Sequence, residues 1–490
     1  MKLKHLSQSK PVRKVSKCKA KTNFTRKSTS ECACGIPNQR YEARVGFTGG
    51  KIWIISIGLL SLGFLFNLWH VAEQEWFDTH QRDTESLIIG RMVKSRQDGI
   101  FSVGGLTGAG ITTNIQQDWI SENQIDNQYA TYLNRGTFDE FSPYMSQTGG
   151  QGIIFSLFDR LIPLSPQIKL WSFYVLTALL SAIVLTAIVG WFYDEFGGWV
   201  AIFVLCSAVL SQWLTVFGKN LWWSLWAFYL PMIVVMCLLK RHRVPANHQF
   251  IKFGILIFIS VFIKCFINGY EYITTTLVMM VTPCIYYGIL DKWNRLQCLK
   301  WSLAAVIGSG VAIFFSIIIL CFQIGAAKNG FMDGVEHVIW SFGKRTYAEP
   351  QDYPAVYAAS LEAGTIGVVI TYMNGIFFDL NNYLSQANSF ISNFLLKIRY
   401  VYLIVLFLVT SILLFIRSTA KQRQQNIALI WTMWFSILAP LSWYVIFKSH
   451  SYIHTHMSFL LWQMPFTFFG FAVFGAAVLV WTKKIESQQG

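Results

Sequence analysis

Long apolar runs constrain this chain more than any other feature of its sequence. About ten runs approach the roughly 20 residues that cross the hydrocarbon core of a bilayer, and 53% of the 490 residues are hydrophobic while only 13% are charged. Backbone polar groups in lipid need partners within the same segment, and a helix supplies them. We therefore predict an all-α polytopic membrane protein with about ten transmembrane helices, at residues 52–69, 170–191, 198–217, 221–239, 250–267, 272–290, 301–324, 401–416, 427–447 and 458–481.

Basic residues between the runs predict the orientation. Residues 1–51 carry thirteen Lys and Arg against two Glu, and later alternate turns are also basic, so the positive-inside rule places both termini in the cytoplasm. The tail 1–51 is rich in Ser and Thr and poor in apolar residues, which predicts disorder. A membrane domain of residues 52–482 and a cytoplasmic C-terminus of residues 483–490 follow. The long segments 71–168 and 325–400 then lie outside, and they contain no Asn-x-Ser/Thr sequon, which is compatible with a bacterial plasma membrane.

Net charge and cysteine usage exclude two other interpretations. The net charge of +15 is concentrated at the cytoplasmic face, where Lys and Arg attract anionic lipid, so it indicates membrane anchoring rather than nucleic-acid binding. None of the nine cysteines lies in either long outer segment, so no disulfide framework is expected there.

The first outer segment, residues 71–168, holds twelve of the chain's twenty-five carboxylates. Asp83 and Glu85 come soon after the first run, and apolar residues at helical spacing follow them. This pattern predicts a helix along the membrane surface that holds both acids just above the bilayer. A carboxylate in that place can take the proton of an incoming hydroxyl. The alternative is a solvated loop, because Asp and Glu are abundant in exposed segments.

A second outer cluster, residues 448–457, combines one lysine with three histidines at the start of the last run. Polar groups at this depth are costly unless they face water, a partner or an anion. We predict that Lys448 and His450 hold a phosphate, and that a helix beginning near His454 adds its N-terminal dipole. In the alternatives, His450, His454 and His456 bind zinc or simply line a wetted span end.

Two further outer turns carry polar residues between apolar runs. Glu271 lies between two tyrosines at bilayer depth, so we expect either a partner such as Lys264 or a ligand, or a structural hydrogen-bond anchor. Lys219 and Asn220 precede a group of tryptophans and are candidates to meet a lipid headgroup or sugar hydroxyls. An interfacial aromatic belt is the alternative for that turn.

This arrangement resembles the GT-C superfamily of integral-membrane glycosyltransferases. The resemblance covers residues 52–481 as topology and rests on Asp83 and Glu85 in the first outer segment and on the basic cluster 448–456 as motifs. The chain lacks the adjacent Asp-Glu pair of protein mannosyltransferases, and it lacks the Trp-Trp-Asp motif of oligosaccharyltransferases. The subfamily therefore stays open.

The resemblance implies an activity and a set of partners. The donor is expected to be a polyprenyl-phosphate-linked sugar, the acceptor a glycan, lipid or protein, and the reaction to occur at the outer membrane face. Asp83 is expected to be the base and Glu85 its partner or alternate, while Lys448, His450 and His454 stabilise the departing phosphate. Some families of this class use a divalent ion such as Mg²⁺ or Mn²⁺, and others do not.

Two other functions fit the topology. An O-antigen-type polysaccharide polymerase or ligase would use outer cations, for which Lys344, Arg345 and Arg399 are available, although the first two look solvated. A lipid-linked-sugar flippase or other transporter is expected to carry charges inside the helix bundle, where Lys264 is almost alone.

Overall fold

The structure, a computed structural model, describes residues 50–112, 122–242, 247–328, 330–383 and 396–489. The predicted disordered tail lies outside these residues except for its last two, which begin helix α1 (Gly50–Phe66).

Helices occupy every place where an apolar run predicted one. Six are long and apolar enough to cross a membrane, which makes the chain a helical membrane-embedded protein. They are α6 (Pro166–Phe196), α10 (Asn247–Asn268), α11 (Ile273–Leu290), α12 (Arg295–Ala327), α17 (Tyr400–Arg417), and α18 (Ala420–Ser436) together with α19 (Leu438–Ile446).

The other four predicted spans form shorter or interrupted helices. The third breaks into α7 (Gly198–Val209) and α8 (Gln212–Phe217), because the Ser211 hydroxyl accepts a hydrogen bond from the Leu214 backbone N–H and starts a new helix. The first and fourth are the short helices α1 and α9 (Leu225–Arg241), and the last is split between η5 (Ser458–Gln463) and α21 (Phe466–Gln489). The number of ten spans therefore stays a prediction.

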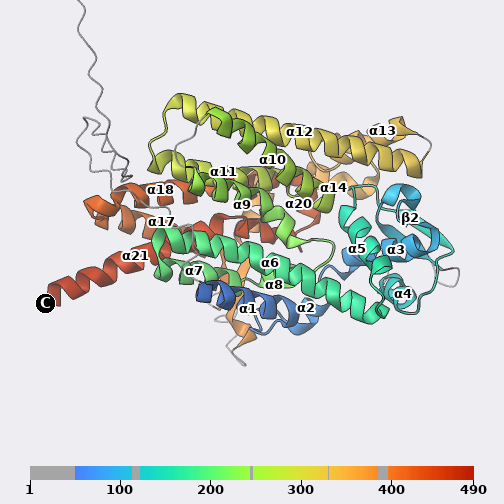
Figure 1. The fold of residues 1–490 in the computed structure, drawn as a ribbon, viewed down its shortest axis with the longest axis horizontal. Coiled ribbons are helices and arrows are strands. Elements are labelled where there is room, and N and C mark those ends of the chain that lie inside the picture. The colour runs from blue at the N-terminus through green and yellow to red at the C-terminus, as the bar shows by residue number, and fades with distance from the viewer. Residues whose placement is uncertain (1–49, 113–121, 243–246, 329, 384–395, 490) are drawn as a thin grey trace, which may run out of the picture. The chain divides into compact units, whose positions relative to one another are not determined.

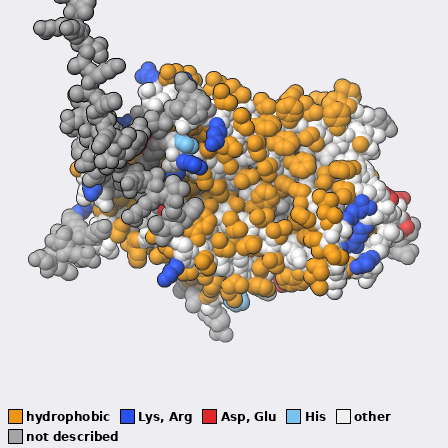
Figure 2. All heavy atoms as spheres, in the orientation of Figure 1, with side chains coloured by type: hydrophobic (Ala, Val, Ile, Leu, Met, Phe, Trp, Pro, Cys, Tyr) orange, Lys and Arg blue, Asp and Glu red, His pale blue; other side chains and the backbone are white. Residues whose placement is uncertain are grey.

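The long helices lie side by side. Helix α10 packs against α12 and α9, α6 against α1 and α7, and α21 against α7 and α17. In Figure 1 the helices of the first outer segment lie at one end of this bundle, and the C-terminal end of α21 lies at the other. Hydrophobic side chains cover the middle of the face drawn in Figure 2, while Lys and Arg gather toward its ends. This distribution suits a bilayer around the middle of the bundle.

The first outer segment is folded. Antiparallel strands β1 (Gly108–Ile111) and β2 (Glu140–Pro143) pair in it, with Gly108 opposite Pro143 and Ile111 opposite Glu140. Its elements are α2 (Gln74–Thr79), α3 (Arg82–Asp98), η1 (Ser102–Gly105), β1 (Gly108–Ile111), α4 (Glu122–Leu133), β2 (Glu140–Pro143) and α5 (Gly150–Leu161).

Helix α3 forms where the sequence predicts one, but its surroundings differ from the prediction. Its apolar residues, such as Ile88 and Met92, are fully buried within the protein and do not lie along a membrane surface. The buried Arg91 guanidinium accounts for this position, since it donates to backbone carbonyls of residues 99–106, including that of Ser102 at 2.6 Å. These carbonyls satisfy the buried charge and fold the following loop over the helix.

The second outer segment combines short helices with one more small sheet. Antiparallel strands β3 (Ile376–Asp379) and β4 (Lys397–Arg399) pair in it. The Asn382 side chain donates to the carbonyl of Val71 at 3.0 Å, so the second outer segment contacts the start of the first outer segment. The helical spans thus fit the predicted all-α class, and the outer segments add two two-stranded sheets. The elements are α13 (Phe331–Gly343), η2 (Pro350–Asp352), η3 (Ala355–Tyr357), α14 (Ala358–Glu362), α15 (Thr365–Met373), β3 (Ile376–Asp379), η4 (Leu380–Asn382) and β4 (Lys397–Arg399), and α20 (Lys448–Ile453) follows α19.

Candidate functional site

Asp83 and His456, from opposite ends of the chain, lie close enough for their charges to interact. Asp83 is partly exposed in the first turn of α3, where the helix dipole favours a negative charge. Burial lowers the pKa of His456, while the nearby Asp83 carboxylate opposes this shift and His450 adds to it. His80, which follows α2, also lies close enough to His456 for their charges to interact. Residues about 370 positions apart in the chain therefore share one polar region.

Glu271 is the centre of a second group in this region. Its carboxylate lies 3.1 Å from His450 Nε2 and 3.7 Å from Arg345 Nη2, and the side chains of Glu271 and Arg345 are each 13% exposed. Burial raises the pKa of Glu271, but His450, Arg345 and His454 outweigh it and hold the pKa well below its usual range. The imidazoles of His450 and His454 lie 4.3 Å apart between ring centres. Glu271 is thus an ionised carboxylate that joins the histidine cluster to the second outer segment.

Lys264 contacts the backbone of the Glu271 turn rather than its carboxylate. Its ammonium group donates to the carbonyls of Gly269 at 2.9 Å and Glu271 at 2.5 Å. Gly269 has a φ of +58°, a left-handed conformation that glycine adopts without strain. The expected partner Lys264 thus contacts Glu271 at its backbone carbonyl, while His450 and Arg345 contact the Glu271 carboxylate.

Glu85 is held by hydrogen bonds from three other parts of the chain. Its carboxylate accepts hydrogen bonds from the hydroxyls of Tyr129 and Tyr174, both at 2.7 Å, and from the Leu221 backbone N–H at 3.0 Å. It is 6% exposed. These bonds tie α3 to α4, to α6 and to the turn before α9, so we interpret Glu85 as a structural carboxylate.

Three of the predicted ligand-binding side chains are also engaged by the protein. The Lys448 ammonium group donates to the carbonyls of Leu361 at 2.6 Å and Ala363 at 2.9 Å. Asn220 accepts from the backbone N–H groups of Trp222 and Trp223 and so shapes its own turn. Lys219 lies 4.0 Å from the centre of the Phe77 ring, and burial lowers its pKa, while Glu85 and Asp78 oppose that shift. These contacts hold all three side chains against other parts of the protein.

Sequence reasoning missed two members of the site. Arg345 was predicted to be solvated, yet it is mostly buried beside Glu271, and its carbonyl accepts from the His450 backbone N–H at 3.3 Å. His80 was passed over within an acidic and aromatic stretch. It packs edge-on against Trp213 and Phe217. Neither residue carries a local signal, because each acquires its partners from a distant part of the chain.

The metal hypotheses find no ligand set among the residues that the structure describes. Within these residues, no group of three or more His, Cys, Asp or Glu side chains is arranged to hold an ion. We therefore assign neither zinc to the three late histidines nor Mg²⁺ or Mn²⁺ to the carboxylates.

The buried histidines make the stability of the fold depend on pH. Burial lowers the pKa of His454 from 6.5 to about 2, with His450 adding to the shift, and lowers that of His80 to about 3, with His456 adding to it. Below pH 6.5 the unfolded chain therefore binds protons that the folded chain does not. We expect stability to fall as pH is lowered from 7 to 5, by up to about 1.4 kcal/mol per histidine and pH unit.

Melting temperatures in detergent at a series of pH values check this expectation. The His454→Gln variant is expected to lose part of the slope of the wild-type protein, because glutamine does not titrate. Parallel pH profiles for the two proteins would contradict it. His242 at the other end of the bundle is the matched control, and the His242→Gln profile is expected to follow the wild type.

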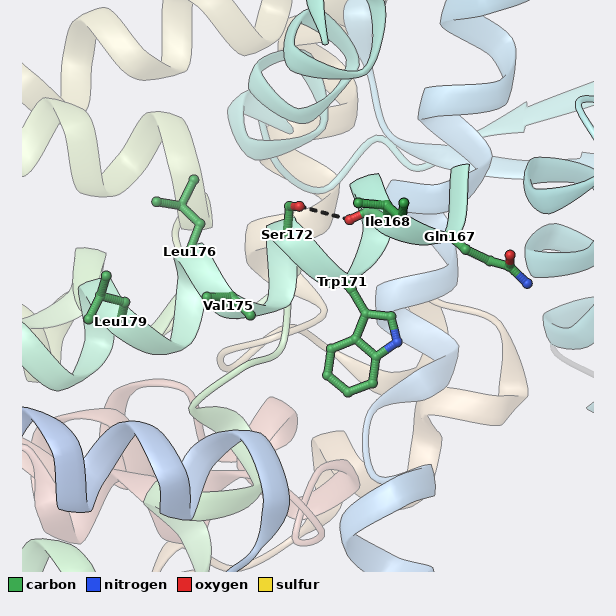
Figure 3. Close-up of a pocket in the computed structure, with 7 residues that line it drawn as sticks. All are labelled: Gln167, Ile168, Trp171, Ser172, Val175, Leu176 and Leu179. Carbon is green, nitrogen blue, oxygen red and sulfur yellow. Dashed lines mark hydrogen bonds between the residues drawn. The ribbon is translucent and has the colours of Figure 1, made fainter. Parts of the chain in front are cut away.

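A hollow along α6 is separate from this polar region. It encloses about 560 Å³, and all of its lining residues belong to that one helix. Figure 3 shows its side chains, among them Trp171, Val175 and Leu179, along one stretch of the helix. These residues are mostly apolar and exposed, so this hollow is a lipid-facing surface rather than a site of chemistry.

No protein-family model matches this chain, and neither does any curated protein or any solved structure, so the functional argument rests on the chain's own geometry.

Proposed function

We propose that this protein is a membrane glycosyltransferase that transfers a sugar from a polyprenyl-phosphate-linked donor to a cell-envelope acceptor at the outer face of the plasma membrane. The observation that carries this proposal is the mostly buried group formed by Glu271, Arg345 and His450, and the charge interaction of Asp83 with His456 supports it. A carboxylate base next to cationic or protonatable side chains is the combination that glycosyl transfer to a hydroxyl requires.

The proposed reaction assigns a task to each group. Asp83 takes the proton of the acceptor hydroxyl, and the acceptor oxygen forms a bond to the anomeric carbon of the sugar. The bond between that carbon and the phosphate oxygen breaks, and the lipid phosphate leaves with the electron pair. Arg345 and the late histidines support the negative charge on the departing phosphate. Lys448 has no part in this proposal, because two carbonyls already occupy its ammonium group.

The burial of two histidines in the polar region also supports proton transfer there. His80 and His454 have strongly lowered pKa values and are therefore neutral at pH 7. Neutral imidazoles can accept or relay a proton but do not pair with the carboxylate as permanent cations. Asp83 is thus left available to a substrate hydroxyl.

An assay of bond formation tests the proposal. Purified protein in vesicles is supplied with polyprenyl-phosphate-linked radiolabelled sugars and with membrane extracts as acceptors. A glycosyltransferase forms a new glycosidic bond and releases polyprenyl phosphate. A flippase or other transporter moves the labelled lipid across the vesicle without forming a product, and that result would refute the transferase.

The polymerase or ligase alternative has one observation in its favour. Arg345 lies beside Glu271, and Arg399 lines an open groove, so two outer arginines are placed near the polar region. A polymerase would join two lipid-linked saccharides and yield a lengthening series of products. A single defined addition favours the transferase.

A further inference from the structure

A groove of about 650 Å³ opens beside the polar region. It lies between α2 and α8 on one side and α15 with the β3–β4 sheet on the other. Helices α2 and α8 pack against each other near the end of α1 (Figure 1). Trp76, Trp213 and Phe459 supply aromatic lining, and Asn374 and Arg399 supply polar lining.

Arg399 is the charged residue of this groove. Its Nη1 donates to the carbonyl of Asn374 at 2.6 Å, and among the residues that the structure describes it has no carboxylate partner. The other polar side chains are already used, since Gln212 Nε2 and Trp213 Nε1 both donate to the Ile376 carbonyl at 2.9 Å. The groove therefore presents one cation with free donors beside aromatic surface, which complements an amphiphilic anion.

The position of Arg399 relative to the membrane indicates which kind of anion the groove would bind. It immediately precedes α17, a candidate membrane span, so we expect its guanidinium at the level where lipid headgroups meet the hydrocarbon core. A lipid phosphate reaches this level from within the membrane while its tail stays in the bilayer.

The aromatic lining also leads toward the proposed base. The ring of Trp76 lies 4.8 Å from that of His80, and Trp213 lies 6.2 Å from the same imidazole, between ring centres. His80 in turn interacts with His456, which interacts with Asp83. The Nε2 atom of His80 is buried and has no hydrogen-bond partner in the described part of the chain. The aromatic lining of the groove thus reaches His80, a buried imidazole whose charge interacts with that of His456.

We infer that this groove captures the phosphate of the polyprenyl-linked donor from the outer leaflet, with Arg399 as its counter-ion, before the sugar moves to Asp83. The inference rests on the proposed function for the identity of the donor. It assigns Arg399 to donor recruitment and not to bond formation, so loss of its charge should raise the KM for the donor and leave kcat nearly unchanged.

Binding of labelled polyprenyl phosphate to the full-length protein in phosphatidylcholine nanodiscs tests the inference. Arg399→Gln keeps an N–H group for the Asn374 carbonyl but removes the charge, and it is expected to weaken binding about tenfold or more. Arg399→Lys, which keeps the charge, should retain part of the affinity. Arg160→Ala removes an exposed arginine of the first outer segment outside the groove and should bind as the wild type does.

Three outcomes would overturn the inference. The first is unchanged affinity in Arg399→Gln. The second is equal competition by phosphatidylglycerol, which would make the groove a general anionic-lipid surface. The third is a lower kcat with an unchanged KM. Asp83→Asn separates this inference from the proposed function, because it should keep polyprenyl-phosphate binding while losing transfer. Binding that depends on Arg399 in a protein without transferase activity would refute the proposed function alone.

Discussion

Replacing Asp83 by asparagine is expected to lower the rate of sugar transfer by about 10²–10⁴-fold, the usual contribution of a general base. Asparagine has nearly the same shape but cannot accept the proton. Within the described residues, the Asp83 carboxylate makes no hydrogen bond or ion pair and interacts with His456 only through its charge, so the fold should tolerate the change. Product formation from a lipid-linked radiolabelled sugar measures the effect, and the melting temperature in detergent checks the fold.

Two other carboxylates of the same segment serve as controls. Glu75 is exposed on α2, and Glu75→Gln should transfer sugar at the wild-type rate. Glu85→Gln disturbs the bonds to Tyr129, Tyr174 and Leu221 and should lower the melting temperature. Normal product formation by Asp83→Asn would remove Asp83 from the site. A folded Glu85→Gln protein without activity would move the base to Glu85.

The helical fold could be predicted from hydropathy because each span satisfies its own backbone within one apolar run. The breaks within the spans could not be predicted from hydropathy. Ser211 lies inside a continuous apolar stretch, and its hydroxyl nonetheless starts a new helix. The break depends on one hydrogen bond, which an average of hydropathy over a window of residues does not register.

The polar composition of the first outer segment did not indicate that this segment folds around a core. Arg91 and Asp159 look solvated in the sequence, yet both are buried. Arg91 binds backbone carbonyls, and Asp159 accepts a bidentate pair of hydrogen bonds from Arg96 at 2.6 and 2.9 Å. Buried charges are stable when they are paired in this way, but the partners come from other parts of the chain. Charge alone therefore suggested a solvated loop where the structure has a packed core.

The sequence predicts which residues belong to the candidate site, but not which groups each of them contacts. Polar residues at span ends are costly, and on this ground the sequence predicts Asp83 and the late histidines as site residues. In the structure the charge of Asp83 interacts with that of His456. Lys448 was chosen on the same ground and instead binds two carbonyls. Its ammonium group was available to any nearby acceptor, and sequence spacing does not reveal which acceptor the fold supplies.

The ion pair at Glu271 is expected to have the largest effect on stability. Glu271→Gln leaves Arg345 without its counter-charge in a mostly buried place, which should cost about 3 kcal/mol. Arg345→Gln should cost a similar amount. The double variant is expected to lose less than the sum of the two, because it leaves neither charge unpaired. Glu349→Gln, at an exposed carboxylate of the same outer segment, is the matched control and should be neutral.

Unfolding of the four proteins in detergent measures the coupling, and strictly additive losses would show that the two side chains do not interact. The pH dependence adds a second check. Because the pKa of Glu271 is lowered in the folded protein, its stabilising charge is fully present above the unfolded value of 4.5 and is lost as pH falls toward the folded value. The stability difference between wild type and Glu271→Gln should therefore stay constant from pH 8 to about 5 and shrink below about 4.5. A difference that already shrinks at pH 6 would contradict the lowered pKa of the Glu271 carboxylate.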